Sequence, residues 1–168
     1  MLEILARPLD AELFAPFGQV LDCAGEADRI INAGLCGRWH DRAALDFGAE
    51  TGGRAGISIF RSEARRLPYV CDLLERHPDG SQAFVPMSEN PFLVIVAPDD
   101  NGRPGTPQAF LTAPGQAINL NRGTWHGVLT PLEYIGTFAV IDRIGPTPNL
   151  EEHVLAEPFR VIGPGSTA

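Results

Sequence analysis

Residues 68–84 read PYVCDLLERHPDGSQAF, and the secondary structure of their first ten residues decides which fold the chain adopts. In a helix, Glu75 and His77 would point in different directions, because residues two apart do not share a helix face. In a strand, the odd-numbered residues from Cys71 to His77 line one face, because side chains alternate with a period of two. We expect a strand over 68–77, because the neighbouring segments also have the pattern of strands.

Short apolar runs separated by turn sequences surround this stretch. The runs are 57–60, 70–76, 83–85, 92–97, 109–111, 117–120, 127–129 and 137–141. Turn signals such as HPDG at 77–80 and PDDNGRPG at 98–105 separate most of them. Strands at intervals of about 8–12 residues, with no helical period between them, predict an all-β antiparallel sandwich or barrel.

Helical patterns are confined to two short peripheral segments. Residues 8–17 predict a helix with Asp10 as its N-cap and Pro16 at its end, and residues 149–156 predict a second one. A length of 168 residues corresponds to one domain. We place this domain at residues 1–162 and expect a disordered tail at 163–168.

The composition argues against several classes of function. The formal net charge is −8, and the basic residues are scattered, whereas nucleic-acid binders concentrate them to neutralise phosphate. No apolar run approaches the ~18 residues of a membrane span, and the acidic N-terminus does not fit a targeting segment. Cys23, Cys36 and Cys71 lack metal-binding spacing, so we expect free thiols in a reducing compartment. We therefore expect a cytoplasmic protein that binds neither nucleic acid nor a membrane.

Two of the four histidines lie in segments that favour a polar site. His77 follows Glu75 by two residues and precedes Gln82 by five, across a tight turn, and His126 lies in NLNRGTWHGVL. Histidine transfers protons near neutral pH, and imidazole and carboxylate both bind divalent metals. The residues alone leave a structural role open, in which His77 caps the turn and Gln82 binds backbone.

The spacing of these residues resembles that of the cupin superfamily. Cupins place metal ligands as His-x-His, then a carboxylate, and a last His in Pro-x-Gly-x-x-His. Glu75-x-His77, Gln82 and Asn121-x-Gly123-x-x-His126 match that spacing. More specifically, LERHPDGSQAFVPM, NRGTWHGVLTPL, INAGLCGRWHD and AVIDR together resemble the ureidoglycolate lyase family, over roughly residues 1–162.

This resemblance implies a cupin-type antiparallel β-barrel or jelly roll, a homodimer, and cleavage of (S)-ureidoglycolate to glyoxylate and urea. It also implies a divalent metal, nickel in particular, with Glu75, His77, Gln82 and His126 as candidate ligands. Compared with the general cupin pattern, Glu75 replaces a histidine and Gln82 replaces a carboxylate. A neutral amide oxygen is a weaker ligand for a transition metal than imidazole or carboxylate. Metal-assisted and metal-free mechanisms therefore both stay open.

The implied reaction needs a base for the substrate hydroxyl, an acid for the departing urea nitrogen, and a cation for the carboxylate. We expect His126 or Glu75 to be the base and His77 to be a metal ligand or the acid. The carboxylate has several candidate partners. The predicted substrate-binding residues are Arg61, Arg143, Asn32 and His40. If the protein is a dimer, we expect Asn32 and His40 of one subunit to complete the pocket of the other.

Two other functions stay open for such a fold. One is a different metal-dependent cupin enzyme, an isomerase or oxygenase that acts on a small polar acid. Gln82 argues against a redox iron site, because such sites favour histidine and carboxylate ligands. The other is a non-catalytic cupin module that binds a metabolite. Such modules often carry an output domain, for which 168 residues leave no room.

Overall fold

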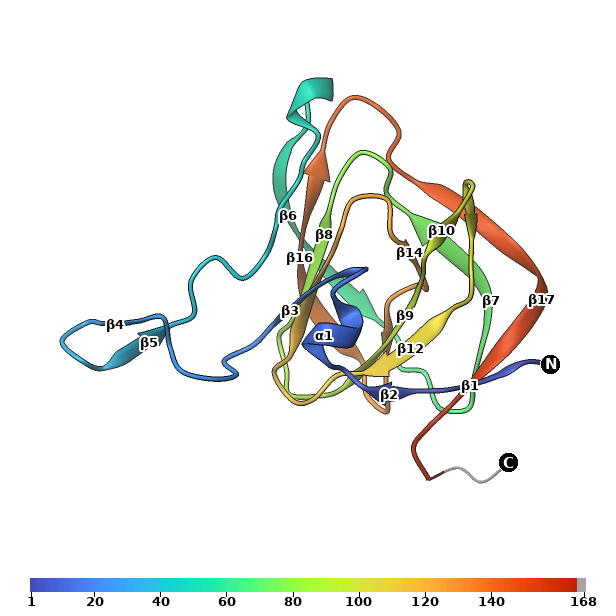
Figure 1. The fold of residues 1–168 in the computed structure, drawn as a ribbon, viewed down its shortest axis with the longest axis horizontal. Helices are drawn as coiled ribbons and strands as arrows, with labels where there is room; N and C mark the ends of the chain where they lie inside the picture. The colour runs from blue at the N-terminus through green and yellow to red at the C-terminus, as the bar shows by residue number, and fades with distance from the viewer. Residues whose placement is uncertain (166–168) are drawn as a thin grey trace.

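The computed structural model describes residues 1–165 and shows a chain whose regular secondary structure is almost entirely β-strand (Figure 1). An eight-stranded sheet curls until its two ends meet. Its path is β1 (Glu3–Leu5), β17 (Glu151–Ile162), β7 (Tyr69–Arg76), β14 (Trp125–His126), β9 (Phe92–Ala97), β12 (Gln108–Leu111) and β2 (Arg7–Pro8), with β15 (Thr130–Pro131) also paired to β9. Because only Ala6 separates β1 from β2, the two ends of the sheet lie next to each other. The predicted all-β barrel is confirmed.

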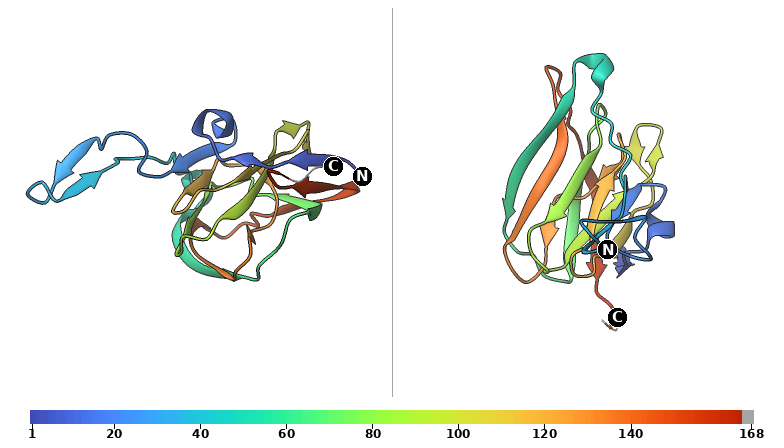
Figure 2. Two further views of the ribbon diagram at one scale, coloured as in Figure 1. Left: turned by 90° about the horizontal axis from the view of Figure 1, so that it is seen from below. Right: turned by 90° about the vertical axis from the view of Figure 1, so that its left-hand side faces the viewer.

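A five-stranded sheet packs against one face of this curled sheet. Its order is β3 (Gly18–Leu21), β13 (Ala117–Leu120), β8 (Gln82–Pro86), β16 (Gly136–Ile144) and β6 (Arg54–Ser62). Two small hairpins complete the β-structure, β10 (Asp99–Asp100) with β11 (Arg103–Pro104) and β4 (Arg29–Ile31) with β5 (Cys36–Arg38). The β4–β5 hairpin projects from the barrel as an arm (Figure 2).

Strand β9 is buried on both faces, because it separates two hydrophobic clusters. Val94 and Val96 face the five-stranded sheet and pack in the cluster that holds Phe84. Leu93 and Ile95 point the other way, into a second cluster enclosed by the curled sheet. This follows from the period-two alternation of a strand. A side chain on the neighbouring strand β14 therefore faces one of these two interiors, according to its register.

The first helical segment forms as predicted but is shorter. Helix α1 spans Ala11–Phe14, and the Asp10 side chain accepts hydrogen bonds from the backbone N–H groups of Glu12 and Leu13 at 3.0 and 2.9 Å. This satisfies donors that have no partner within the helix. A 3-10 turn, η1, spans Ala49–Thr51. No helix within residues 1–165 is long and apolar enough to cross a membrane.

The prediction of a second helix at 149–156 is wrong. These residues enter β17, which pairs antiparallel with β7 from Glu151↔Arg76 to Val161↔Tyr69. As a helix they would leave that edge of β7 without a partner, and unpaired backbone groups favour strand addition. Of the predicted tail at 163–168, the last three residues lie outside the described range.

One detail of the strand at 68–77 also differs from expectation. β7 forms, but Cys71 packs beside Leu74 in the second cluster instead of sharing the face of Glu75. The register with β17 shifts between Val154 and Phe159, opposite this part of β7. Such an irregularity interrupts the alternation of side chains.

Candidate active site

Strand pairing brings the two predicted motifs together. β14 lies between β7 and β9, where His126 is the direct partner of Glu75 on one side and of Val96 on the other. Val96 faces the cluster between the two sheets, so His126 and Glu75 face that interior as well. β7 ends at Arg76, and His77 starts the turn that follows.

Glu75, His77 and His126 form a compact triad. One potential ligand atom from each lies within 4.8 Å of the other two, an arrangement that could hold a metal ion. The His126 Nδ1 atom lies 3.9 Å from Glu75 Oε1, and the rings of His77 and His126 have centroids 5.4 Å apart. Ligand atoms that share one ion at about 2.1 Å lie roughly 3–4 Å apart. The triad is therefore close to the dimensions of a metal site.

Backbone carbonyls set the tautomer of both histidines. His77 Nδ1 lies 2.6 Å from the carbonyl oxygen of Asn149, and His126 Nδ1 lies 3.0 Å from that of Gly127. Because a carbonyl can only accept, each Nδ1 carries the hydrogen and each Nε2 keeps a lone pair. Both Nε2 atoms are buried and have no partner among residues 1–165. Metal-bound histidines usually donate their other ring N–H in the same way.

Burial shifts the protonation of Glu75 and His126 toward neutral forms. It is the largest cause of the lowered pKa of His126, which is about 4; a protonated His77 contributes to the lowering, and the hydrogen bond to the Gly127 carbonyl opposes it. Burial also raises the pKa of Glu75, an effect that His77 opposes and Glu152 reinforces. At neutral pH His126 is thus an uncharged imidazole, able to bind a metal or accept a proton.

The space beside His126 is small and mostly apolar. A cavity of about 20 Å³ borders the ring and is lined by side chains that include Phe84, Ile118 and Leu120. A single water needs roughly 10–15 Å³ of such space. This space is therefore too small to hold a substrate.

Gln82 is held by a residue that the sequence did not single out. It lies on β8, only 5% exposed, and its Nε2 donates to Asp142 Oδ2 at 3.2 Å. Its Oε1 is buried and has no partner in the described part of the chain. Gln82 and Asp142 are direct partners in the register of β8 with β16.

The Arg143 side chain forms hydrogen bonds to two different loops, those that contain Thr51 and Thr147. The side chain is buried, and its Nη2 donates to the hydroxyls of Thr51 and Thr147 at 3.1 and 2.9 Å. Glycines surround it: a Cβ on Gly145 would lie 2.5 Å from the guanidinium carbon, and one on Gly53 2.7 Å from Nε. These contacts hold the guanidinium group between the loops, while its Nε is buried without a hydrogen-bond partner among residues 1–165.

The other predicted substrate-binding residues are exposed. Arg61 lies on the edge strand β6, and Asn32 lies at the tip of the β4–β5 arm with a positive φ of 53°. The backbone N–H of His40, just after the arm, donates to Asp28 Oδ2 at 2.8 Å. Within residues 1–165, the charged groups that shift the pKa of Glu75 are His77 and Glu152, and no arginine is among them.

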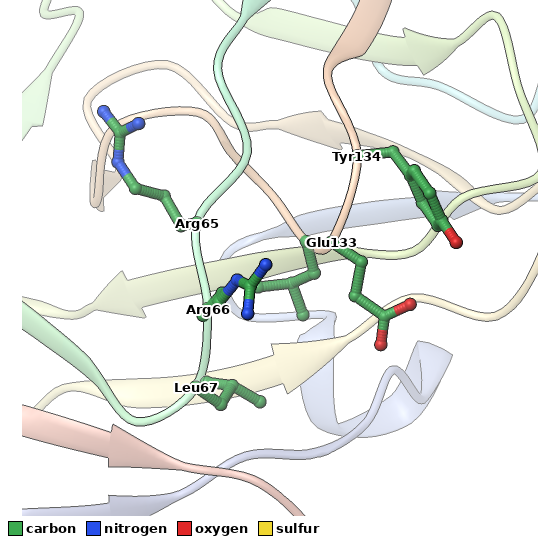
Figure 3. Close-up of a pocket in the computed structure, with 6 residues that line it drawn as sticks. Arg65, Arg66, Leu67, Glu133 and Tyr134 are labelled. Carbon is green, nitrogen blue, oxygen red and sulfur yellow. The ribbon is translucent and has the colours of Figure 1, made fainter.

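A larger cavity, of about 540 Å³, lies elsewhere. It is lined by Arg65, Arg66, Leu67, Leu132, Glu133 and Tyr134 (Figure 3). In this view Arg65 points away from the group formed by Arg66, Leu67 and Glu133. None of the triad lines this cavity, so its volume does not mark the reaction centre.

The chain matches the family described as ureidoglycolate lyase over residues 1–162. It belongs to the ureidoglycolate lyase family. A protein from Rhodobacter capsulatus named ureidoglycolate lyase is 58% identical over 163 residues, covering 97% of this chain and all of that protein. Proteins from Chelativorans sp., named ureidoglycolate lyase, and Rhizobium meliloti, named ureidoglycolate lyase 2, are 47% and 46% identical. The alignments cover 96% of this chain and 97% and 98% of the two relatives. The resemblance expected from the motifs is confirmed.

Two residues that support the site of this family member were missed by sequence reasoning. Asn149 orients His77 through its carbonyl, and its side-chain Oδ1 accepts from the backbone N–H of Asp79 at 2.7 Å. Asp142 holds Gln82. A carboxylate at the end of the apolar part of the strand sequence AVIDR is a signal that could have drawn attention to Asp142. No comparable signal marks Asn149, because its contacts depend on a loop 70 residues away.

Proposed function

We propose that the chain cleaves ureidoglycolate to glyoxylate and urea at the triad of Glu75, His77 and His126. The observation that carries the proposal is the convergence of these three side chains, with two unpartnered Nε2 lone pairs, in a member of this family. Relatives that carry the name ureidoglycolate lyase align over nearly the whole chain, which supports the same chemistry here.

The reaction is an elimination at a carbon that bears a hydroxyl, a ureido nitrogen and a carboxylate. A base removes the hydroxyl proton, the oxygen forms a double bond to carbon, and the carbon–nitrogen bond breaks. The departing nitrogen takes up a proton and leaves as urea. Glu75 is suited to the base role, because its raised pKa makes its carboxylate more basic than an exposed one. His126 is the alternative base, and His77 is suited to protonate the nitrogen.

The donor set also fits a divalent metal, and we propose nickel. Two imidazoles with free Nε2 atoms and one carboxylate would hold it, and imidazole suits nickel among the first-row metals. When bound, such an ion would polarise the hydroxyl oxygen and ease loss of its proton. Glu75, His77 and His126 would orient the ion, and the apolar side chains that line the small cavity beside His126 would limit water.

We further propose a homodimer in which the β4–β5 arm approaches the partner's site. The arm projects from the barrel and exposes apolar side chains, with Leu35 at 90% and Ile30 at 63% (Figure 2). Because no arginine within residues 1–165 shifts the pKa of Glu75, Asn32 and His40 on or beside the arm remain candidates for the substrate carboxylate. The unpaired cysteines fit the reducing cytoplasm that we propose as its location.

The test begins with chelator-treated protein incubated with racemic ureidoglycolate, with and without added nickel. Equal amounts of glyoxylate and urea, limited to half of the racemate, support (S)-specific cleavage, and the nickel comparison shows whether metal acts. Folded His126→Ala should lose nearly all activity, whereas the matched control His153→Gln should retain it. Absence of both products from folded protein under both conditions would overturn the proposal, and oxygen uptake with iron would indicate a different enzyme.

A further inference from the structure

The interior face of the five-stranded sheet carries an oriented pair of polar side chains that the triad does not use. Gln82 and Asp142 face each other across β8 and β16, joined by a hydrogen bond of 3.2 Å from Gln82 Nε2 to Asp142 Oδ2. The neighbouring side chains Phe84, Leu120 and Val140 belong to the core cluster, and Gln82 is buried whereas Asp142 is half-buried. A buried amide beside apolar side chains calls for a hydrogen-bond partner for each of its polar atoms.

Asp142 determines which end of the Gln82 amide is free. An ionised carboxylate accepts hydrogen bonds but cannot donate them, so the NH₂ group of Gln82 must face Asp142. The amide oxygen of Gln82 then points elsewhere, and it is buried with no partner within residues 1–165. Because an unsatisfied buried acceptor destabilises the fold, this oxygen is an acceptor held ready for a donor.

The strand register places this acceptor near the triad. The ring of Phe84 lies with its centroid 6.5 Å from that of His126, and Gln82 is the next residue on the same face of β8. Two residues along a strand span roughly 6.6 Å. The displacement is toward the barrel end where the turn after His77 leads directly into β8. Gln82 and Asp142 therefore face the same end of the interior as the triad.

Two acceptors with a net negative charge select a neutral group that offers N–H donors. A ureido group has three such hydrogens and no charge, whereas a carboxylate would be repelled by Asp142. We propose that Gln82 and Asp142 form the subsite for the ureido end of the substrate. Gln82 contacts the ureido nitrogen, and Asp142 is the positioning residue that fixes its amide. The inference rests on the proposed function and adds an orientation, in which the substrate carboxylate points away from this pair.

The test measures inhibition of the lyase reaction by each product separately. In Asp142→Asn, the side-chain amide at position 142 can donate a hydrogen bond to Gln82 Oε1, so this oxygen is either occupied or turned away from the substrate. Gln82→Met removes the oxygen with little change in side-chain volume. In both variants the inhibition constant of urea and the KM for ureidoglycolate should rise about 10-fold, the effect of one lost buried hydrogen bond. The inhibition constant of glyoxylate should change less than about twofold, because glyoxylate lacks the ureido group.

Ser81→Ala is the matched control. It alters the residue before Gln82, whose hydroxyl binds the backbone of Asp46, and leaves the acceptor in place. It should leave both inhibition constants unchanged. Parallel weakening of urea and glyoxylate in the Asp142 and Gln82 variants would overturn the subsite and indicate a structural role. Loss of nickel affinity in Gln82→Met would also overturn it, because Gln82 would then be a metal ligand. If the wild-type protein releases no urea, the proposed function itself fails.

Discussion

The backbone N–H of Gly123 donates a hydrogen bond of 2.9 Å to the carbonyl oxygen of His77. This bond joins the turn before His126 to the turn after Glu75, so the two halves of the triad share one support. Gly123 adopts a φ of +77°, a conformation that glycine enters without strain. Beside it, Arg122 Nε donates to the carbonyl oxygen of Pro78 at 2.7 Å.

Arg122→Ala should impair both stability and catalysis. The side chain is 31% exposed, and besides Pro78 it reaches the carboxylate of Glu50 at 2.6 Å. Loss of hydrogen bonds to a charged group should cost about 1–3 kcal/mol in the free energy of unfolding. A displaced His77 should lower kcat/KM at least about 10-fold. Urea denaturation and steady-state kinetics check these values, with exposed Arg103→Ala as the control. Wild-type behaviour of Arg122→Ala would show that the turn does not depend on this side chain.

The stability of metal-free protein should fall on acidification because of His126. Its pKa is about 4 in the folded protein, against about 6.5 in an unfolded chain. Between these values the unfolded chain binds a proton that the folded protein does not, so stability falls as the pH drops from 6.5 toward 4. The full effect is about 3 kcal/mol at most.

Urea denaturation of the chelated protein at pH 7.5 and pH 5 measures this loss, which should be smaller in His126→Gln. Glu75 acts in the opposite direction, because its pKa is raised in the folded state and protonation therefore favours folding. Glu75→Gln should consequently show a steeper loss on acidification than the wild type. An equal pH dependence in all three proteins would contradict both assignments.

The three cysteines should differ sharply in reactivity. Cys71 is 1% exposed, and burial raises the pKa of its thiol to about 11, whereas Cys23 is exposed and Cys36 partly so. Since the thiolate is the reactive form, Cys71 should stay unmodified by a thiol reagent at pH 8. Titration should give two reactive thiols in the native protein and a third in denaturant. Modification of three thiols in the native wild type, against two in Cys71→Ser, would contradict the burial of Cys71.

Phe14→Ala should be among the most destabilising single changes. The ring is fully buried and meets Phe110 edge-on, with centroids 5.8 Å apart, so that α1 packs on the core through this residue. Truncation of a buried phenylalanine costs about 3–5 kcal/mol. Leu13→Ala on the same helix, at 46% exposure, should cost less than about 1 kcal/mol. Thermal and urea denaturation compare the two, and equal losses would show that α1 does not anchor through Phe14.

Local sequence was sufficient for the elements whose pattern is strong. The strand at 68–77 followed from its expected neighbours and from the shared face of Glu75 and His77, and the Asp10 cap followed from residue type. The helix predicted at 149–156 was wrong because Glu, Leu and Ala favour a helix when only the local sequence is considered. Its strand state depends on pairing with β7, whose residues lie about 75 positions earlier in the chain. Non-local pairing of this kind leaves no local signature.

The sequence by itself determined the family, the barrel class and the spacing that brings Glu75, His77 and His126 together, because each motif is a short strand end plus its turn. Only the tertiary structure decided what lies across the barrel from them. The pairing of β8 with β16 sets Asp142 against Gln82, and the loop after β16 brings the carbonyl of Asn149 to His77. The contact between Gln82 and Asp142 joins residues 60 positions apart, and the contact between His77 and Asn149 joins residues 72 positions apart. Strand register and loop packing fix them, and both are properties of the whole fold.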